Sequence, residues 1–243
     1  MTYDGTRYAG YQRQPQGVPT IQRAVETAIA EVTGQTVVVL GAGRTDAGVH
    51  ASGQVIAFDC EWKHSSEDLW RAINVYLPPD IALLNLETAP LGFHPRYDAV
   101  SRRYHYQFYI SPVRYPLLDR THWHISYKLD LAVMQTAANL LIGVHDFATF
   151  GQPTKGEVTI REIYEANFKG IDTNLYQFVI EGNAFLKHMV RSIVGTLVEV
   201  GRGKKTLEEF ADAFAAADRR RAGTTAPPHG LILVHVSYSE KEK

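Results

Sequence analysis

Strand-like and helix-like segments alternate in the first hundred residues, and a similar order returns in the rest of the chain, which leaves few folds open. The first helix is expected at 20–34, capped by Thr20 and ended by Gly34. The second is expected at 66–77, with Ser66 as its cap. Strands are expected at 1–3, 36–40, 53–59 and 81–89.

The rest of the chain predicts a second unit of the same kind. Helices are expected at 130–143, 184–201 and 206–217, and strands at 101–110, 157–170, 175–183 and 231–238. This repetition predicts an α+β protein of two ferredoxin-like halves that share one mixed, mainly antiparallel sheet flanked by helices. We expect the halves at 1–98 and 99–243, with the chain crossing between them at 95–99.

Composition and charge narrow the classes of function. With 243 residues, 45% of them hydrophobic, the chain is long enough to bury a core. The 25 Lys and Arg oppose 26 Asp and Glu, a net charge of -1, so a nucleic-acid partner must be held by a local basic patch. The single cysteine, Cys60, excludes an internal disulfide and fits a reducing compartment. No apolar run is long enough to span a membrane and no signal peptide is recognisable, so we expect a soluble, cytoplasmic protein.

The stretch GAGRTDAGVHASGQ at 41–54 is the strongest candidate for a functional loop. Its glycines surround one carboxylate, Asp46, with Arg44 two residues before it and His50 four residues after it. The stretch lacks the Lys-Ser/Thr ending of a nucleoside-triphosphate loop, and a strand follows it instead of a helix, which disfavours a phosphate cradle. A metal site is disfavoured because Asp46 and His50 have no third ligand nearby, and an aspartic-protease site needs a second loop that the chain lacks.

Two interpretations of this loop remain open. An attacking carboxylate must be ionised, and a guanidinium two residues away lowers its pKa and orients it, so Asp46 is a candidate nucleophile. The alternative is a glycine-rich turn closed by a salt bridge, which is the commoner structure for this spacing. On the residues alone, the loop does not decide between them.

The stretch SRRYHY, which ends at Tyr106, alternates charged and aromatic side chains. On a strand, Arg102 and Tyr104 face one side, and Arg103 and His105 face the other. Arginine beside tyrosine is typical of single-stranded RNA recognition, in which rings stack on bases and guanidinium groups hold phosphate. An edge strand with packed tyrosines gives the same pattern.

In FLKHMVRSIVG, Lys187 and Arg191 are expected four residues apart on an otherwise apolar helix. Such cations usually extend to solvent, whereas a buried arginine here would need a carboxylate partner, and Asp46 is a candidate. His122 and His124 form an isolated pair, which indicates a structural feature more than a metal site. Basic residues also cluster at Lys204 and Lys205 and at 219–221, where they are candidates for contact with RNA.

These stretches occur together in one known family. YDGTRYAGYQRQ, GAGRTDAGVHASGQV, NVYLPPDI, FHPRYDAVSRRYHY, HDFATF and NAFLKHMVRSIVGTLVEVG follow the order and spacing of the TruA family of tRNA pseudouridine synthases. The resemblance covers nearly the whole chain, and GRTDAGVHA is highly specific to that family. The chain departs from the family in a shorter first strand, which begins at Met1, and in Tyr11, which replaces a tryptophan and should keep the packing.

The resemblance implies the pseudouridine-synthase fold and an isomerase that converts uridine to pseudouridine at positions 38, 39 and 40 of the tRNA anticodon stem-loop. It further implies a homodimer with no metal or organic cofactor. By motif position, Asp46 is the nucleophile. Arg44 helps flip the target nucleotide, and Tyr104 packs on the uracil. Arg191 pairs with the catalytic acid, and Leu231 lines the uracil pocket. Candidate substrate-binding residues also include His50, Arg102 and Arg103.

Two other functions compete with this expectation. A non-catalytic RNA-binding module would use the same basic and aromatic residues but would be indifferent to Asp46. A metal-dependent hydrolase would respond to a chelator. For the isomerase, attack of Asp46 on C6 of the base or on C1′ of the ribose stays open, and Tyr104 is a candidate for the base that removes the C5 proton.

Overall fold

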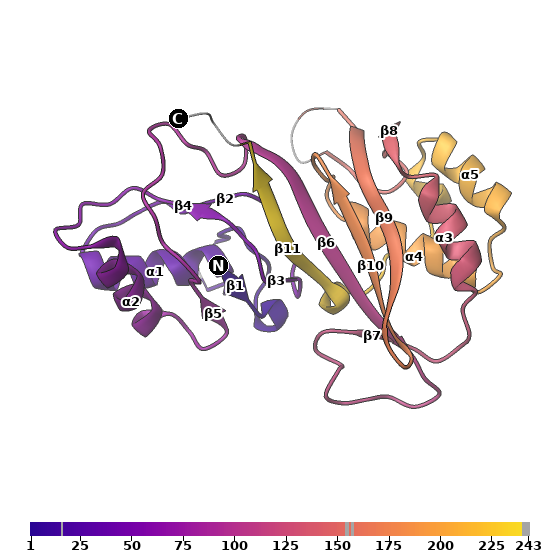
Figure 1. Ribbon diagram of the computed structural model, residues 1–243, viewed down its shortest axis with the longest axis horizontal. Helices are drawn as coiled ribbons and strands as arrows, with labels where there is room; N and C mark the ends of the chain where they lie inside the picture. Colours follow the sequence, from indigo (N-terminus) through magenta and orange to yellow (C-terminus); the bar gives the residue numbers. More distant parts are fainter. Residues whose placement is uncertain (16, 154–155, 157, 240–243) are drawn as a thin grey trace. The chain divides into compact units, whose positions relative to one another are not determined.

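The computed structural model describes residues 1–15, 17–153, 156 and 158–239. The chain forms two compact units, one made of Met1–Val100 with the segment from Ile232 onward and the other of Ser101–Leu231 (Figure 1). Each unit combines strands with helices, which confirms the predicted α+β class. The predicted division into 1–98 and 99–243 differs at the C-terminal strand, which belongs to the first unit from Ile232 onward.

The sheet of the first unit is built from short strands. It contains, in spatial order, β5 (Ile81–Ala82), β1 (Thr2–Tyr3), β3 (His50–Ala51) and β11 (Leu231–Tyr238). Strand β1 is antiparallel to β5 and β3, and β11 is parallel to β3. A separate antiparallel pair consists of β2 (Leu40–Gly41) and β4 (Ile56–Ala57). The strands predicted on either side of the glycine-rich stretch are therefore mostly irregular, and the stretch itself supplies β3.

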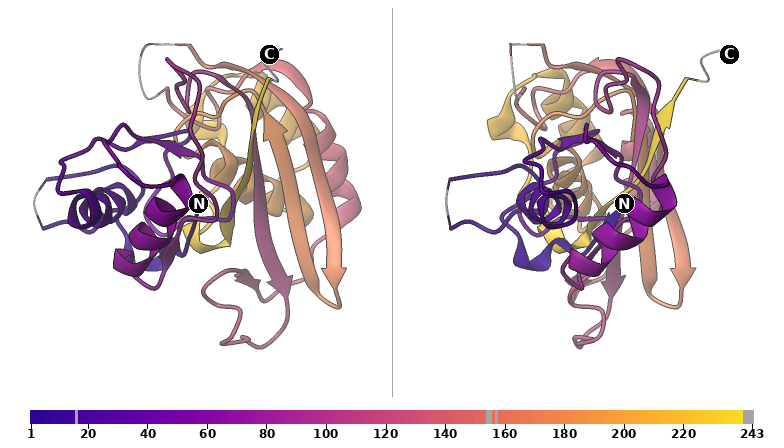
Figure 2. Two further views of the ribbon diagram at one scale, coloured as in Figure 1. Left: turned by 60° about the vertical axis from the view of Figure 1, so that its left-hand side comes forward. Right: turned by 90° about the vertical axis from the view of Figure 1, so that its left-hand side faces the viewer.

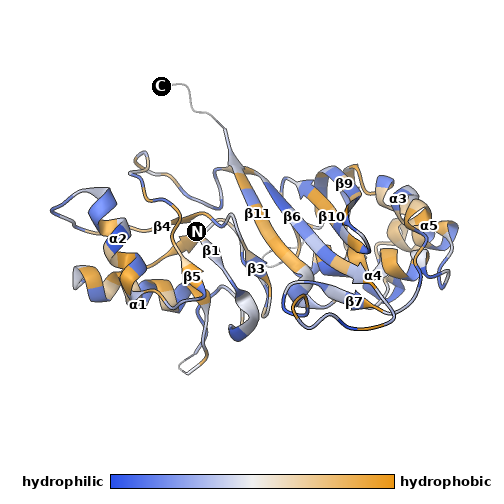
Figure 3. Cartoon of the chain, turned by 60° about the horizontal axis from the view of Figure 1, so that its bottom comes forward, coloured by the Kyte–Doolittle hydropathy of each residue, from blue (hydrophilic) through white to orange (hydrophobic). Residues whose placement is uncertain are grey.

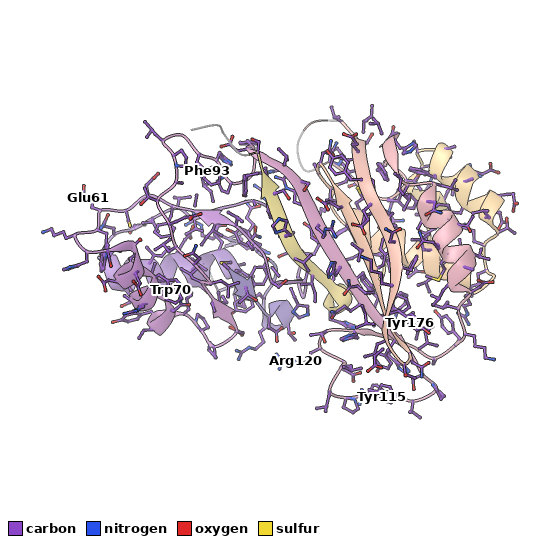
Figure 4. The ribbon with its side chains drawn as sticks, in the orientation of Figure 1. Glu61, Trp70, Phe93, Tyr115, Arg120 and Tyr176 are labelled. Carbon is purple, nitrogen blue, oxygen red and sulfur yellow. The ribbon has the colours of Figure 1, made fainter. Side chains whose placement is uncertain are left out.

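Helices α1 (Ile21–Thr33) and α2 (Ser66–Tyr76) pack against each other in the first unit (Figure 2). As predicted, Thr20 caps α1 and Gly34 ends it with a φ of 70°. Helix α2 is capped by Ser65, not by the predicted Ser66, because the Ser65 side chain accepts the N–H of Asp68. The indole of Trp70 donates to the Leu83 carbonyl at 2.6 Å, which attaches α2 to the segment after β5 (Figure 4).

The sheet of the second unit has longer strands. It contains, in order, β6 (Ala99–Ile110), β10 (Leu175–Gly182), β9 (Ile160–Asp172) and β8 (Gly143–Asp146), all antiparallel to their neighbours. Strand β7 (Trp123–Ile125) pairs with β6 in parallel. The sequence did not predict β8, because a run this short carries too little alternation. Within each unit the pairing is mixed and mainly antiparallel, as predicted.

Helices α3 (Leu131–Asn139), α4 (Met189–Gly201) and α5 (Leu207–Ala215) lie on one face of this second sheet (Figures 1 and 2). Most of α4 is buried, and Figure 3 shows how apolar it is. Fully buried aromatic side chains fill the core: Phe147, Phe150, Phe178 and Phe210. No helix in the described part of the chain combines the length and the apolar character needed to cross a membrane.

Helix α4 is shorter than the predicted helix at 184–201. The Lys187 N–H donates to the Gln152 carbonyl at 2.9 Å, and His188 takes a positive φ of 65°. The chain therefore enters the helix only at Met189. The prediction that Lys187 and Arg191 lie one turn apart on a helix is wrong, because the contact with residue 152 keeps Lys187 outside it.

Candidate active site

Asp46 lies in a turn within the glycine-rich stretch, between β2 and β3. The Val49 N–H donates to the Asp46 carbonyl at 3.1 Å, and Gly48 takes a positive φ of 76°. The buried amide of Gln54 closes the stretch on itself, since it accepts from the Gly43 N–H at 3.3 Å and donates to the Gly43 carbonyl at 2.9 Å. Hydrogen bonds before and after Asp46 therefore limit the movement of its backbone.

The segment from Tyr3 to Tyr11, here called the N-terminal clamp, holds this turn from outside. The hydroxyls of Tyr3 and Thr45 lie 2.8 Å apart, and both side chains are buried. The Tyr11 N–H donates to the Thr45 carbonyl at 3.0 Å, and the Gly48 N–H donates to the Tyr8 carbonyl at 3.3 Å. Residues on both sides of the carboxylate are thus bonded to a segment that is distant in the sequence.

Two glycines allow the clamp and the loop to approach this closely. Gly10 has a φ of 103°, and a Cβ there would lie 2.8 Å from the Thr45 carbonyl oxygen. A Cβ at Gly41 would lie 2.5 Å from the Tyr11 hydroxyl oxygen. A larger residue at either position would push the clamp and the loop apart.

Tyr11, the residue that replaces a tryptophan of the resembled family, is 3% exposed, so the aromatic packing is kept. Its hydroxyl is buried and has no hydrogen-bond partner among the residues that the structure describes. Burial raises the pKa of Tyr11 above its ordinary value, so the hydroxyl stays protonated at neutral pH.

His50 begins β3, and its side chain is only 4% exposed. The Gly5 N–H donates to His50 Nδ1 at 3.1 Å, and a carboxylate oxygen of Asp4 lies 3.2 Å from the same nitrogen. The imidazole is therefore a further attachment between the clamp and the loop. Direct contact of His50 with a substrate stays a prediction.

Arg44 is exposed and, within the described residues, forms no ion pair with Asp46. The described residues therefore do not contain the salt bridge that was one of the two interpretations of this loop. An exposed guanidinium near the carboxylate suits contact with a base or a phosphate of a bound nucleic acid.

Tyr104 lies on β6 in the second unit, opposite Ile180 of β10. Its side chain is 8% exposed, and its ring meets the ring of Phe185 edge-on at 5.1 Å. On the same face, the Tyr106 hydroxyl donates to the Pro227 carbonyl at 2.8 Å. Burial raises the pKa of Tyr106 well above its ordinary value, so this hydroxyl stays protonated at neutral pH.

The two arginines beside Tyr104 face opposite sides of β6, as the alternation predicted. Arg102 is 8% exposed and donates to the Asn183 carbonyl at 2.9 Å. Arg103 pairs with Glu165 at 2.9 Å and with Glu181 at 2.6 Å. Both guanidinium groups therefore have partners within the protein, and their contact with RNA stays a prediction.

Arg191 and Leu231 are connected through one segment of the second unit. Arg191 Nε on α4 donates to the Ala226 carbonyl at 2.9 Å, and the Ala226 N–H donates to the Arg191 carbonyl at 3.0 Å. This reciprocal pair attaches α4 to the segment that leads to Leu231, which is 6% exposed. The predicted pairing of Arg191 with the carboxylate of Asp46 stays a prediction.

The two histidines considered as metal ligands have separate structural contacts. His122 Nδ1 lies 2.8 Å from the Thr121 hydroxyl, whereas His124 Nε2 lies 2.8 Å from the Ser111 carbonyl and its ring stacks on Tyr109. These contacts agree with the structural role predicted for the pair. In the part of the chain that the structure describes, no three His, Cys, Asp or Glu side chains gather as a metal site would require.

The N-terminal clamp is the part of the site that sequence analysis missed. YDGTRYAGYQRQ entered only through the resemblance, and apart from the packing expected of Tyr11 no role was assigned to its tyrosines or glycines. The sequence does contain a signal for this contact: glycines lie between the tyrosines of this stretch, and glycine allows the backbone to approach another segment closely. Only the fold identifies that segment as the loop of Asp46.

Comparison with known proteins identifies the class of this chain. A family model described as "tRNA pseudouridine synthase" matches residues 1–98 and 137–239. These ranges contain Asp46, the N-terminal clamp, Arg191 and Leu231, but not Tyr104. The chain belongs to the tRNA pseudouridine synthase family, whose enzymes are isomerases that convert uridine to pseudouridine in tRNA.

Relatives along the whole chain confirm the resemblance to the TruA-type members of that family. The tRNA pseudouridine synthase A of Myxococcus xanthus is 42% identical over 241 residues, which are 99% of this chain and 91% of the relative. That of Syntrophotalea carbinolica is 42% identical over 244 residues, with coverages of 100% and 96%. That of Neisseria meningitidis serogroup B is 42% identical over 243 residues, with coverages of 99% and 91%.

Proposed function

We propose that this enzyme isomerises uridines 38, 39 and 40 of the tRNA anticodon stem-loop, with Asp46 as the nucleophile. The observation that supports this assignment best is the setting of Asp46, the one carboxylate of GAGRTDAGVHASGQ, in a turn bonded on both sides to the N-terminal clamp. An attacking group held in a fixed backbone loses little freedom when it reaches the transition state. The relatives named tRNA pseudouridine synthase A support the choice of substrate.

The reaction exchanges one glycosidic bond for another. The bond between N1 of uracil and C1′ of ribose breaks, the uracil turns, and a bond forms between C5 and C1′. One proton leaves C5 and one proton is taken up by N1. Atoms and electrons balance without a redox partner. Asp46 attacks C6 or C1′ and is displaced when the new bond is complete.

The remaining candidates take roles around the uracil. We assign Tyr104 to pack on the base and to remove the C5 proton, Leu231 to line the uracil pocket, and Arg191 to pair with the nucleophile. A uridine within or beside a stem must leave its stack, at a cost of a few kcal/mol. We assign the exposed Arg44 to fill the gap that the base leaves, which would offset part of that cost. Arg102, Arg103 and His50 complete the proposed substrate-binding set.

The test uses unmodified tRNA that carries tritium at C5 of uridine. The wild-type enzyme should release tritium and form pseudouridine at 38, 39 and 40. In Asp46→Asn the rate of tritium release should fall at least about a thousandfold, while the affinity for tRNA stays within a few-fold of the wild-type value. Asp59→Asn, which removes an exposed carboxylate outside the loop, is the matched control. Turnover by a folded Asp46→Asn protein near the wild-type rate removes Asp46 from the mechanism, and pseudouridine elsewhere rejects the proposed positions.

Two further measurements address the partners and the competing hydrolase. EDTA should leave tritium release unchanged once the tRNA has been folded, whereas a metal-dependent hydrolase would stop. We also propose that the enzyme acts in the cytoplasm as a homodimer, in which basic residues of two copies line one groove for tRNA. Sedimentation of the active enzyme as a monomer would reject that dimer.

A further inference from the structure

The second unit contains a pocket of about 300 Å³ that includes none of the residues assigned to the reaction. It is lined by residues of β7, of the C-terminal part of α4 and of the segment 224–227. Its walls include Trp123, Tyr127, Glu199, Arg202, Lys204 and Thr224, and it is here called the Trp123 pocket. This volume is at the lower end of the range of ligand sites, about 300–1,000 Å³, and suits a group the size of one nucleotide base.

Two cations of this pocket have no acidic partner. Within the described residues, neither Arg202 nor Lys204 pairs with a carboxylate, although both are exposed. Other arginines of the same unit are paired, such as Arg114 with Asp119 at 3.1 Å. The Arg202 guanidinium lies over the Tyr127 ring at 4.1 Å, which holds this planar cation in place before any ligand arrives. An arginine held in place beside a lysine, neither with an acidic partner among the described residues, indicates an anionic ligand.

The other walls indicate that the ligand is also flat and carries N–H donors. Trp123 is half-buried and meets Tyr106 edge-on at 6.2 Å, so its ring is fixed by packing. Oε1 of Glu199 accepts the Thr224 N–H at 2.8 Å, so this carboxylate is held inside the pocket. A carboxylate repels free phosphate but accepts N–H groups of a nucleobase. Aromatic rings, cations and a carboxylate together match a nucleotide better than an inorganic anion or a lipid headgroup.

We propose that the Trp123 pocket binds one unpaired nucleotide of the tRNA, separate from the uridine that reacts. The base stacks against Trp123, its N–H groups reach Glu199, and its phosphate is held by Arg202 and Lys204. The proposal rests on tRNA as the substrate, and it depends neither on Asp46 as nucleophile nor on positions 38 to 40. Its failure and the failure of the proposed mechanism are therefore distinguishable.

The first test measures tRNA affinity in matched pairs of variants of the full chain. Arg202→Gln and Lys204→Gln should each weaken binding at least about fivefold, since each removes a contact to one bound nucleotide. The controls Arg114→Gln, an exposed but paired arginine, and Lys63→Gln, an exposed lysine outside the pocket, should change it by less than about twofold. Equal losses in pocket and control variants would show that only overall charge matters and would overturn the proposal.

The second test follows tryptophan fluorescence and does not depend on catalysis. Binding of tRNA should quench emission in the wild-type enzyme and equally in Asp46→Asn, whereas Trp123→Phe, which keeps an aromatic ring in the wall, should lose most of the quenching. Uridine and adenosine monophosphates are the small probes, and inorganic phosphate is the comparison. Unchanged quenching in Trp123→Phe, or competition by phosphate as strong as by the nucleotides, rejects a nucleotide in this pocket.

Discussion

Asp46 and Tyr104 are carried by backbones of opposite kinds. Asp46 lies in a glycine-rich turn between two-residue strands, and its surroundings are fixed by hydrogen bonds to a segment some forty residues earlier in the sequence. Tyr104 lies within the 12 residues of β6, where pairing with β10 runs without interruption from Tyr109 back to Arg102. The position of Asp46 therefore depends on contacts with a distant segment, whereas the position of Tyr104 depends on the hydrogen bonds of its own strand.

This difference predicts which substitutions should displace each residue. Changes in the N-terminal clamp should displace Asp46 although no clamp residue reacts, because the turn has few supports of its own. Changes beside Tyr104 should leave its backbone in place, because each neighbour contributes only one of many ladder hydrogen bonds. The predictions below compare the two sites, beginning with the largest expected effect.

Tyr104→Phe should lower turnover by about a hundredfold or more, if the hydroxyl removes the C5 proton as proposed. The ring remains to pack on Phe185 and on the uracil, so tRNA affinity and the free energy of unfolding should barely change. The measurement is tritium release at saturating tRNA, beside urea unfolding. Tyr104→Ala should lose affinity as well, and a fully active Tyr104→Phe enzyme would show that the C5 base lies elsewhere.

Gly10→Ala should lower turnover by about tenfold and destabilise the protein by about 1–3 kcal/mol. An alanine is strained at a φ of 103°, and its Cβ would lie 2.8 Å from the carbonyl oxygen of Thr45, the residue before Asp46. Gly17→Ala is the matched control, because Gly17 also has a positive φ, 87°, but has nothing within 4 Å of a Cβ. Both variants should lose stability, and only Gly10→Ala should lose turnover. Equal turnover in the two would mean that the clamp does not position Asp46.

The contrast between loop and strand also explains what the sequence predicted. The long strands β6, β9, β10 and β11 and the caps of α1 were predicted, because alternation and capping are local signals. The short strands β1, β2, β4 and β5 of the first unit lie within or at the end of predicted strands, although most are shorter than predicted. Strand β3 was not predicted, because it depends on pairing between distant segments: it lies in a stretch expected to be a loop and pairs with β1 and β11.

In the candidate site, too, local sequence signals predicted some features, whereas others depend on the fold. Asp46 was found from its motif, and the opposite faces of Arg102 and Arg103 followed from alternation. The salt bridge between Arg44 and Asp46 was one of two interpretations of their spacing, and no such ion pair is present among the described residues. The carboxylate partners of Arg103 lie on β9 and β10, and only strand register brings them together.

Tyr3→Phe should destabilise the protein by about 1 kcal/mol and lower turnover a few-fold. It removes the hydroxyl that lies 2.8 Å from that of Thr45 and leaves a buried polar group with one partner fewer. Urea unfolding and tritium release measure the two effects. Wild-type turnover in a destabilised variant would mean that this contact supports the fold but not the position of Asp46.

The same hydroxyl predicts a loss of stability at alkaline pH. Burial raises the pKa of Tyr3 to about 12, above its ordinary value of about 10. A raised pKa in the folded state means that protonated Tyr3 favours folding; this contribution is complete below pH 10 and is lost as the pH rises toward 12. The free energy of unfolding should fall over that interval, and less steeply in Tyr3→Phe. Parallel pH curves for the two proteins contradict this assignment.

Tyr11→Phe should have the smallest effect and the opposite sign. The Tyr11 hydroxyl is buried without a hydrogen-bond partner among the described residues, so its removal relieves the cost of keeping a polar group from water. The ring remains packed at Gly41, and stability should be unchanged or rise by up to about 1 kcal/mol with turnover unaffected. The test is urea unfolding of Tyr3→Phe and Tyr11→Phe side by side, since both remove one buried tyrosine hydroxyl from the N-terminal clamp. If both variants lose the same stability, then hydrogen bonding to the loop is not what distinguishes the two tyrosines, and the clamp holds Asp46 by packing alone.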